Sequence, residues 1–153
     1  ARIASLIDRM VRDDFAGREA SQALASIGRP ALPALIAALD HPVARVRYWS
    51  IAALSEIGDA RAVAPVLRAL EDADPLVRAV AVWHLGRWFE RQEVREAVIG
   101  RLDDPSTLVR GWTLRRIDAS RPSPVCAGSS RPRSRRCATT RFIRWPSSRV
   151  RMC

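Results

Sequence analysis

The sequence predicts an all-α fold, a right-handed α-solenoid made of stacked helical hairpins. The main observation is an internal repeat: three segments align from Leu39, Leu70 and Leu102, which lie 31 and 32 residues apart. Each segment has an arginine eight residues after its leucine, and an apolar stripe at helical spacing follows. A repeat of this length suits a two-helix unit that buries its apolar face against its neighbours.

Each repeat also carries start and stop signals for helices. Asp74-Pro75 and Asp104-Pro105 predict an N-cap carboxylate followed by a proline at the first helical position, where its missing N–H costs nothing. Gly28 and Gly58 are expected to end helices, because glycine readily adopts the conformation of a C-terminal cap. The predicted buried stripes are Val46, Ser50 and Leu54, then Val77, Ala81 and Leu85, then Val109, Thr113 and Ile117.

The repeats occupy residues 1–118, and residues 119–153 form an Arg-, Ser- and Pro-rich tail. Counted from arginine to arginine, the units run 16–46, 47–77, 78–109 and, truncated, 110–118, with an N-terminal helix before them as a cap. The solenoid holds 17 arginines and 16 acidic residues, so its net charge is only +1. The tail holds nine arginines and no acidic residue, so it supplies the basic character of the chain.

The tail has two interpretations. As a natural segment it would be a disordered basic arm able to contact phosphates. As a frameshift product it would overwrite a further repeat, because reading it one base out of register restores apolar residues and an arginine at the repeat spacing. A high-GC bacterial gene agrees with the frameshift and with the complete lack of lysine. If the repeat stops near Ser120, the last helix loses its neighbour, and we expect it to fray.

The repeats resemble the short bacterial HEAT-like repeats first described in phycobilisome lyase subunits. The resemblance rests on the pattern D-x-VR-xx-A-xxx-LG, covers about residues 16–118, and is closest in the segment from Asp74 to Gly86. Gly17 in place of the arginine and Phe89 in place of a turn glycine depart from it. The resemblance implies structural ion pairs between adjacent units, formed by Arg47, Arg78 and Arg110 with Asp40, Asp72 and Asp103.

A partner-binding ridge is expected on the outward side of the second helix of each unit. The core takes the positions three and seven residues after the repeat arginine, so the positions two and five after it face outward. The ridge residues are Trp49, Trp83, Trp112 and Arg115, with Tyr48 and Arg87 nearby. Aromatic anchors flanked by arginine are typical of protein-binding surfaces. The alternative is that these rings pack between hairpins, and that Trp88 and Phe89 fill the place of the missing glycine turn.

Catalytic and metal-binding readings find little support. The two histidines, His41 and His84, stand alone, without the His-Glu dyads that iron-binding HEAT-like hydroxylases need. No glycine-rich phosphate loop occurs, and Cys126, Cys137 and Cys153 lack the spacing of a metal site. We therefore expect no catalytic residue, no metal and no cofactor, and the sequence predicts that the protein is not an enzyme.

The favoured function is a cytoplasmic scaffold or adaptor that holds a partner protein on the concave face of the solenoid. One alternative is nucleic-acid binding, resembling the HEAT-like alkylpurine DNA glycosylases, with Trp83, Trp112, Arg115, Arg116 and Asp118 around a base. The nearly neutral solenoid argues against it. A second alternative, a lyase- or chaperone-like subunit, follows from the resemblance alone. No run of apolar residues is long enough to span a membrane, and the oligomeric state is left open.

Overall fold

The structure is a computed structural model that describes residues 2–120, and these residues form a stack of four helical hairpins. The hairpins pair the following helices: α1 (Arg2–Arg9) with α2 (Asp14–Ile27), α3 (Leu32–Ala38) with α4 (Ala44–Ile57), α5 (Val63–Arg68) with α6 (Pro75–Leu85), and α7 (Gln92–Ile99) with α8 (Thr107–Ser120). No strand occurs within residues 2–120. The prediction of an all-α solenoid is therefore confirmed. The three cysteines, and the two interpretations of the sequence beyond Ser120, lie outside the described residues.

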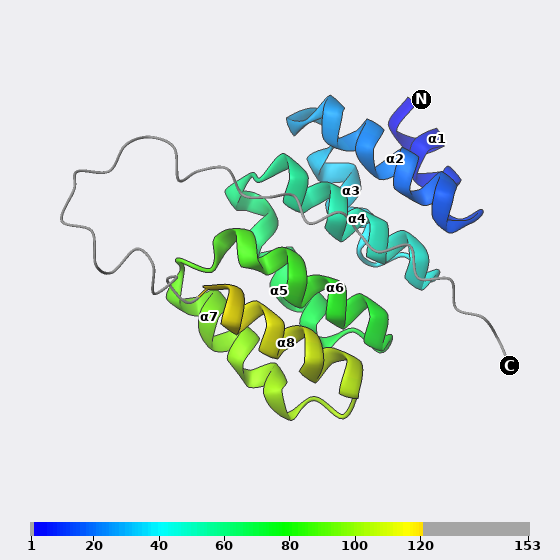
Figure 1. The fold of residues 1–153 in the computed structure, drawn as a ribbon. Coiled ribbons are helices and arrows are strands. Elements are labelled where there is room, and N and C mark those ends of the chain that lie inside the picture. The colour runs from blue at the N-terminus through cyan, green and yellow to red at the C-terminus, as the bar shows by residue number, and fades with distance from the viewer. Residues whose placement is uncertain (1, 121–153) are drawn as a thin grey trace, which may run out of the picture. The chain divides into compact units, whose positions relative to one another are not determined.

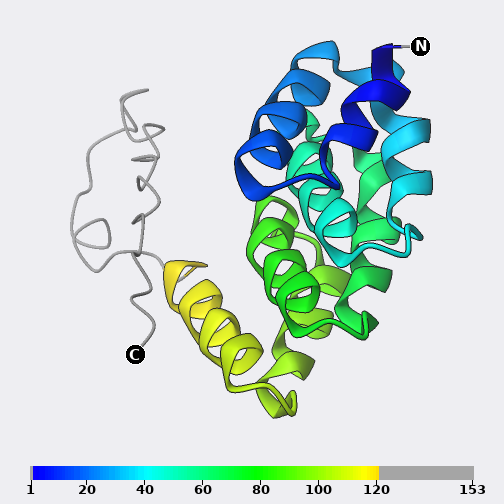
Figure 2. The ribbon, with the colours of Figure 1, turned by 90° about the vertical axis from the view of Figure 1, so that its right-hand side faces the viewer.

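The helices form two layers. The second helices of the hairpins, α2, α4, α6 and α8, pack side by side in one row, which we call the inner row (Figure 1). The first helices, α1, α3, α5 and α7, make up the other layer, as the turned view shows (Figure 2). The segment from residue 110 is thus part of a complete fourth hairpin, because its first helix, α7, precedes it.

Short 3-10 turns join many of these helices. They are η1 (Arg29–Ala31), η2 (Ala60–Ala62), η3 (Ala69–Glu71), η4 (Gly86–Trp88) and η5 (Gly100–Asp103). The turn η4 stands at the end of the third hairpin, where the first two hairpins end in a glycine with positive φ. It buries Trp88, and Phe89 packs against the core. The two aromatic residues thus take up space next to the fourth hairpin, at the place where the repeat departs from its pattern.

The predicted start and stop signals of the helices correspond to specific hydrogen bonds and backbone angles in the structure. Asp74 caps α6 by accepting the Leu76 N–H at 2.8 Å, and the proline follows at the first helical position. Gly28 and Gly58 end α2 and α4 with φ of 73° and 68°, a region that residues with a β-carbon rarely adopt. Asp104 differs from the prediction, because α8 begins only at Thr107.

One apolar core runs through the stack. The predicted stripes of α4 and α6 are fully buried, and Val109 and Thr113 of α8 are buried with them. The middle position of each stripe is small, Ser50, Ala81 or Thr113, which lets neighbouring helices approach closely. Within residues 2–120 no helix is both long and apolar enough to cross a membrane.

Candidate protein-interaction surface

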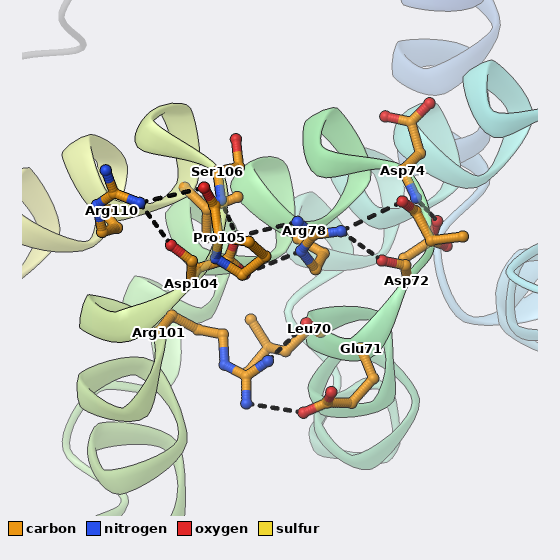
Figure 3. A network of polar contacts seen from close by, with 12 residues as sticks. Leu70, Glu71, Asp72, Asp74, Arg78, Arg101, Asp104, Pro105, Ser106 and Arg110 are labelled. Carbon is orange, nitrogen blue, oxygen red and sulfur yellow. Dashed lines mark hydrogen bonds and ion pairs between the residues drawn. The ribbon is translucent and has the colours of Figure 1, made fainter.

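Arginines on two helices of the inner row clamp the second hairpin to the third and the third hairpin to the fourth. Arg47 on α4 donates from Nε and Nη2 to the carboxylate of Asp72, over 2.7 and 2.8 Å. Arg78 on α6 donates in the same way to Asp104, with both distances 2.9 Å (Figure 3). The Nη1 of each arginine donates instead to backbone carbonyls just before its own helix. Two-pronged pairs fix orientation as well as distance, so these clamps set the register of the stack.

The prediction that Asp40 and Asp103 form such pairs is wrong. The clamp carboxylate lies six residues before the arginine of its own repeat, whereas Asp40 and Asp103 lie seven before it. At the sixth position the carboxylate accepts a backbone N–H two residues on, at 2.8 Å in both Asp72 and Asp104. This turn directs the side chain toward the preceding hairpin. The seventh position is exposed, and there Glu71 pairs with Arg101 instead, over 2.8 Å.

Between the first and second hairpins, both members of this clamp are missing. Gly17 stands where the arginine would be, and His41 stands where the carboxylate would be. His41 keeps the local turn, since its Nδ1 accepts the Val43 N–H at 3.1 Å. Arg45 links the two hairpins by another route, with Nε on Asp14 at 3.0 Å and Nη1 on a carbonyl of the preceding loop at 3.1 Å. The replacement of the repeat arginine by Gly17 is therefore accompanied by the replacement of its carboxylate partner by His41.

The clamps remain charged near neutral pH. The hydrogen bond from Arg78 lowers the pKa of Asp104 below its ordinary value, and the same bond raises the pKa of Arg78. Burial acts to raise the pKa of Asp72, but the hydrogen bonds from Arg47 and from the backbone outweigh it and the net pKa is lowered. These carboxylates therefore stabilise the stack as anions, and their role is structural.

The tryptophans of the predicted ridge lie partly buried between neighbouring helices of the inner row. The indole of Trp49 lies directly over Gly17 of α2, where a β-carbon would overlap the ring. Trp83 and Trp112 meet edge to face, with ring centroids 5.1 Å apart. The guanidinium of Arg116 covers the Trp83 ring at 5.1 Å and donates to the Trp83 carbonyl. The rings thus pack one hairpin on the next and leave only part of their surface to solvent.

The remaining predicted ridge residues differ in exposure. Tyr48 packs against Trp49 edge to face, with centroids 5.0 Å apart, and is half-buried. Arg87 is exposed and covers Gly58 at the end of α4, where a β-carbon would overlap its guanidinium. Arg115 on α8 is also exposed. Of the predicted ridge, the two arginines are therefore the residues that the described structure leaves most open.

A row of exposed apolar side chains was missed by the sequence analysis. Phe15, Leu76 and Leu108 are 73%, 57% and 37% exposed, and each lies near the start of an inner-row helix. They occupy one register, two residues before the repeat arginine or its replacement Gly17, and Arg45 holds the same place in α4. Because α2, α4, α6 and α8 lie side by side, these positions follow one another along the surface. We call Phe15, Leu76 and Leu108 the apolar row; aligning the repeats at this position would have revealed it.

A buried serine and a half-buried histidine meet between α4 and α6. Ser55 Oγ lies 2.5 Å from His84 Nδ1 and 3.0 Å from the carbonyl of Ala52. Burial lowers the pKa of His84 to about 4, with a smaller contribution from Arg116, so the ring is neutral at pH 7. Such a pair satisfies two polar groups inside the stack. Among residues 2–120 no group of three or more potential ligands could hold a metal ion.

Comparisons with known proteins agree with this geometry. A family model described as HEAT repeats matches residues 3–74, and one described as a HEAT repeat associated with sister chromatid cohesion matches residues 90–114. This chain is a HEAT-like repeat protein. The HEAT fold is also shared with a solved structure, the complex of CpcE and CpcF of phycocyanin lyase from Nostoc sp. PCC7120. That likeness has a TM-score of 0.67 and 25% identity, and covers 75% of each chain. No curated protein matches.

Proposed function

We propose that this HEAT-like repeat protein is a non-catalytic scaffold that binds a partner protein on the surface of its inner row. The observation that carries the proposal is the apolar row of Phe15, Leu76 and Leu108. Single exposed apolar residues are common, but three in one register of the inner row make a strip that only the α4 position, Arg45, interrupts. Arg45, between Phe15 and Leu76 in register, adds a polar contact to this strip.

The charge of the solenoid favours a protein over a nucleic acid. With 17 arginines against 16 acidic residues, residues 1–118 lack the positive field that phosphate binding needs. Many of these arginines are engaged in clamps, caps and ring contacts within the stack. A partner that buries the apolar row would gain mainly from the removal of apolar surface from water.

Photo-crosslinking in the source cell tests this proposal. A photoreactive phenylalanine at position 76 or 108 is expected to give a discrete crosslinked product with one partner. The matched control positions are 92 and 96 on α7, which are also exposed but belong to the layer of first helices. The variant Phe15→Ser is expected to weaken the crosslink from position 76. The same products from positions 76, 108, 92 and 96, or no product from 76 and 108, would refute the assignment.

A lyase-like subunit is the second candidate, and the likeness to the phycocyanin lyase complex supports it. In that case the partner on the apolar row would be a phycocyanin-like protein. Binding of purified phycocyanin to the full chain, measured by calorimetry, distinguishes the two candidates. The lyase-like assignment requires binding that Leu76→Ser and Leu108→Ser weaken, whereas the scaffold assignment alone requires none.

A further inference from the structure

Within residues 2–120, no other helix covers the edge of α8 that points away from α6. In α4 and α6 the residue four after the repeat arginine, Ile51 or Val82, is fully buried under the next hairpin. The equivalent residue of α8, Leu114, is 57% exposed. A β-carbon on the neighbouring Gly111 would meet no atom of the described residues within 4 Å. We call Arg110, Gly111, Leu114 and Asp118 the α8 edge.

Arg110 is oriented on this edge to receive a carboxylate. Its Nη1 donates to the carbonyls of Asp104 and Pro105, at 2.7 and 3.2 Å, as the Nη1 of Arg78 does at the start of α6 (Figure 3). In Arg47 and Arg78 the opposite edge of the guanidinium, Nε and Nη2, holds a carboxylate of the next hairpin. Among the described residues no carboxylate meets that edge of Arg110.

The sequence limits what can supply this carboxylate. Residues 119–153 contain nine arginines and no aspartate or glutamate, so they offer no side-chain anion to Arg110. The edge itself carries one, because Asp118 lies eight residues after Arg110 and is exposed. The corresponding residues of the second and third hairpins are Ser55 in α4 and Gly86 in η4, so the acid is particular to the bare edge.

We propose that the α8 edge binds a second copy of this chain, with the two α8 helices antiparallel around a two-fold axis at Leu114. Arg110 and Asp118 lie at equal distances on either side of Leu114, about 6 Å along the helix axis. Antiparallel pairing therefore sets Arg110 of each protomer opposite Asp118 of its partner. The two leucines meet at the centre, and the edge is complementary to itself, as a two-fold interface requires.

The other features of the edge agree with close helix packing. Residues at i, i+4 and i+8 form a ridge, and contacts between such ridges are the commonest way in which helices pack. Gly111 costs the isolated helix stability relative to alanine and has no close neighbour among residues 2–120. A glycine beside the ridge lets a second helix approach. Since one helix per protomer makes a small interface, the dimer is weak and depends on concentration.

Sedimentation velocity of the full chain, from about 1 µM to about 1 mM, tests the proposal. The wild type is expected to shift from monomer to dimer over this range. Arg110→Asp or Asp118→Arg alone sets like charges opposite each other in both symmetric pairs, and each is expected to weaken the dimer about tenfold or more. The exchanged variant, Arg110→Asp with Asp118→Arg, restores opposite charges and is expected to recover dimerisation.

Two further variants secure the interpretation. Leu114→Asp leaves the backbone bonds of Arg110 in place and is expected to abolish the dimer even if Arg110→Asp loosens the start of α8. Arg12→Asp, with an exposed arginine in the loop before α2, is the matched control and should leave the dimer unchanged. A monomer at every concentration overturns the proposal. So does a dimer that withstands Leu114→Asp, or single reversals that the exchange does not rescue.

Discussion

Replacing Asp104 with alanine removes the carboxylate of the clamp between the third and fourth hairpins. Its side chain is 2% exposed and that of Arg78 is 12% exposed, so the pair is shielded from water. The variant leaves the guanidinium buried without its anion, which costs about 3 to 5 kcal/mol in comparable pairs. It also removes the acceptor for the Ser106 N–H, so we expect a loss of unfolding free energy near the upper end of that range.

Urea unfolding followed by circular dichroism measures this loss, and Asp103→Ala is the matched control. Asp103 is the adjacent residue, is exposed and has no clamp, so its replacement is expected to change stability by less than about 0.5 kcal/mol. Tryptophan fluorescence is a second probe, because the edge-to-face pair of Trp83 and Trp112 spans the α6–α8 contact and contributes to the signal. Both probes should show the Asp104→Ala transition shifted to lower urea.

A double-mutant cycle separates the pair from the helix start. Arg78→Ala with Asp104→Ala should cost much less than the sum of the two single variants, because no buried charge is left alone. Equal losses for Asp104→Ala and Asp103→Ala, or strict additivity in the cycle, would refute the assignment of the clamp carboxylate to the sixth position before the arginine.

Three further predictions concern the packing of the stack. Gly17→Ala should destabilise the fold by about 1 to 3 kcal/mol, because its β-carbon would overlap the Trp49 ring. Gly111→Ala should instead raise the stability of the monomer by about 0.5 to 1 kcal/mol. Thermal melting at low protein concentration compares the two variants. Because the pKa of His84 is lowered, the unfolded chain binds one more proton than the folded chain between about pH 6.5 and 4. The free energy of unfolding should therefore fall as the pH drops through this window, by at most about 3 kcal/mol. His84→Gln should flatten this decrease. Ser55→Ala leaves His84 Nδ1 without its partner and should cost about 1 to 3 kcal/mol in urea unfolding at pH 7.

The local signals in the sequence were sufficient for the helices and the core. The glycines at 28 and 58 and the Asp74-Pro75 start each act within one turn of helix, and the period of 31–32 residues is visible along the chain, so all of them can be recognised without the fold. The stripe of Val46, Ser50 and Leu54 was likewise predicted to be buried, and it is. Spacing on one helix determines which residues share a face, so this part of the structure follows from the sequence.

The partners across hairpins depended on the tertiary structure. Asp103 and Asp104 are adjacent in one turn, so the sequence does not show which of them meets Arg78. The folded turn directs the carboxylate of Asp104 toward the preceding hairpin. The outward direction of Trp49 was predicted from its own helix alone, yet Gly17 on the neighbouring helix receives the ring. Both outcomes depend on how neighbouring hairpins pack against each other, which spacing within one helix does not determine.

The charge of the chain shows the same division. The sequence alone establishes that residues 1–118 are nearly neutral and that the excess of arginine lies in residues 119–153. Only the folded hairpins show that Arg47 and Arg78 form ion pairs within the stack. Arg110 has the same place in its repeat, but one edge of its guanidinium meets no carboxylate among the described residues. Composition counts charges, but the free energy of each one depends on what the neighbouring hairpin places opposite it.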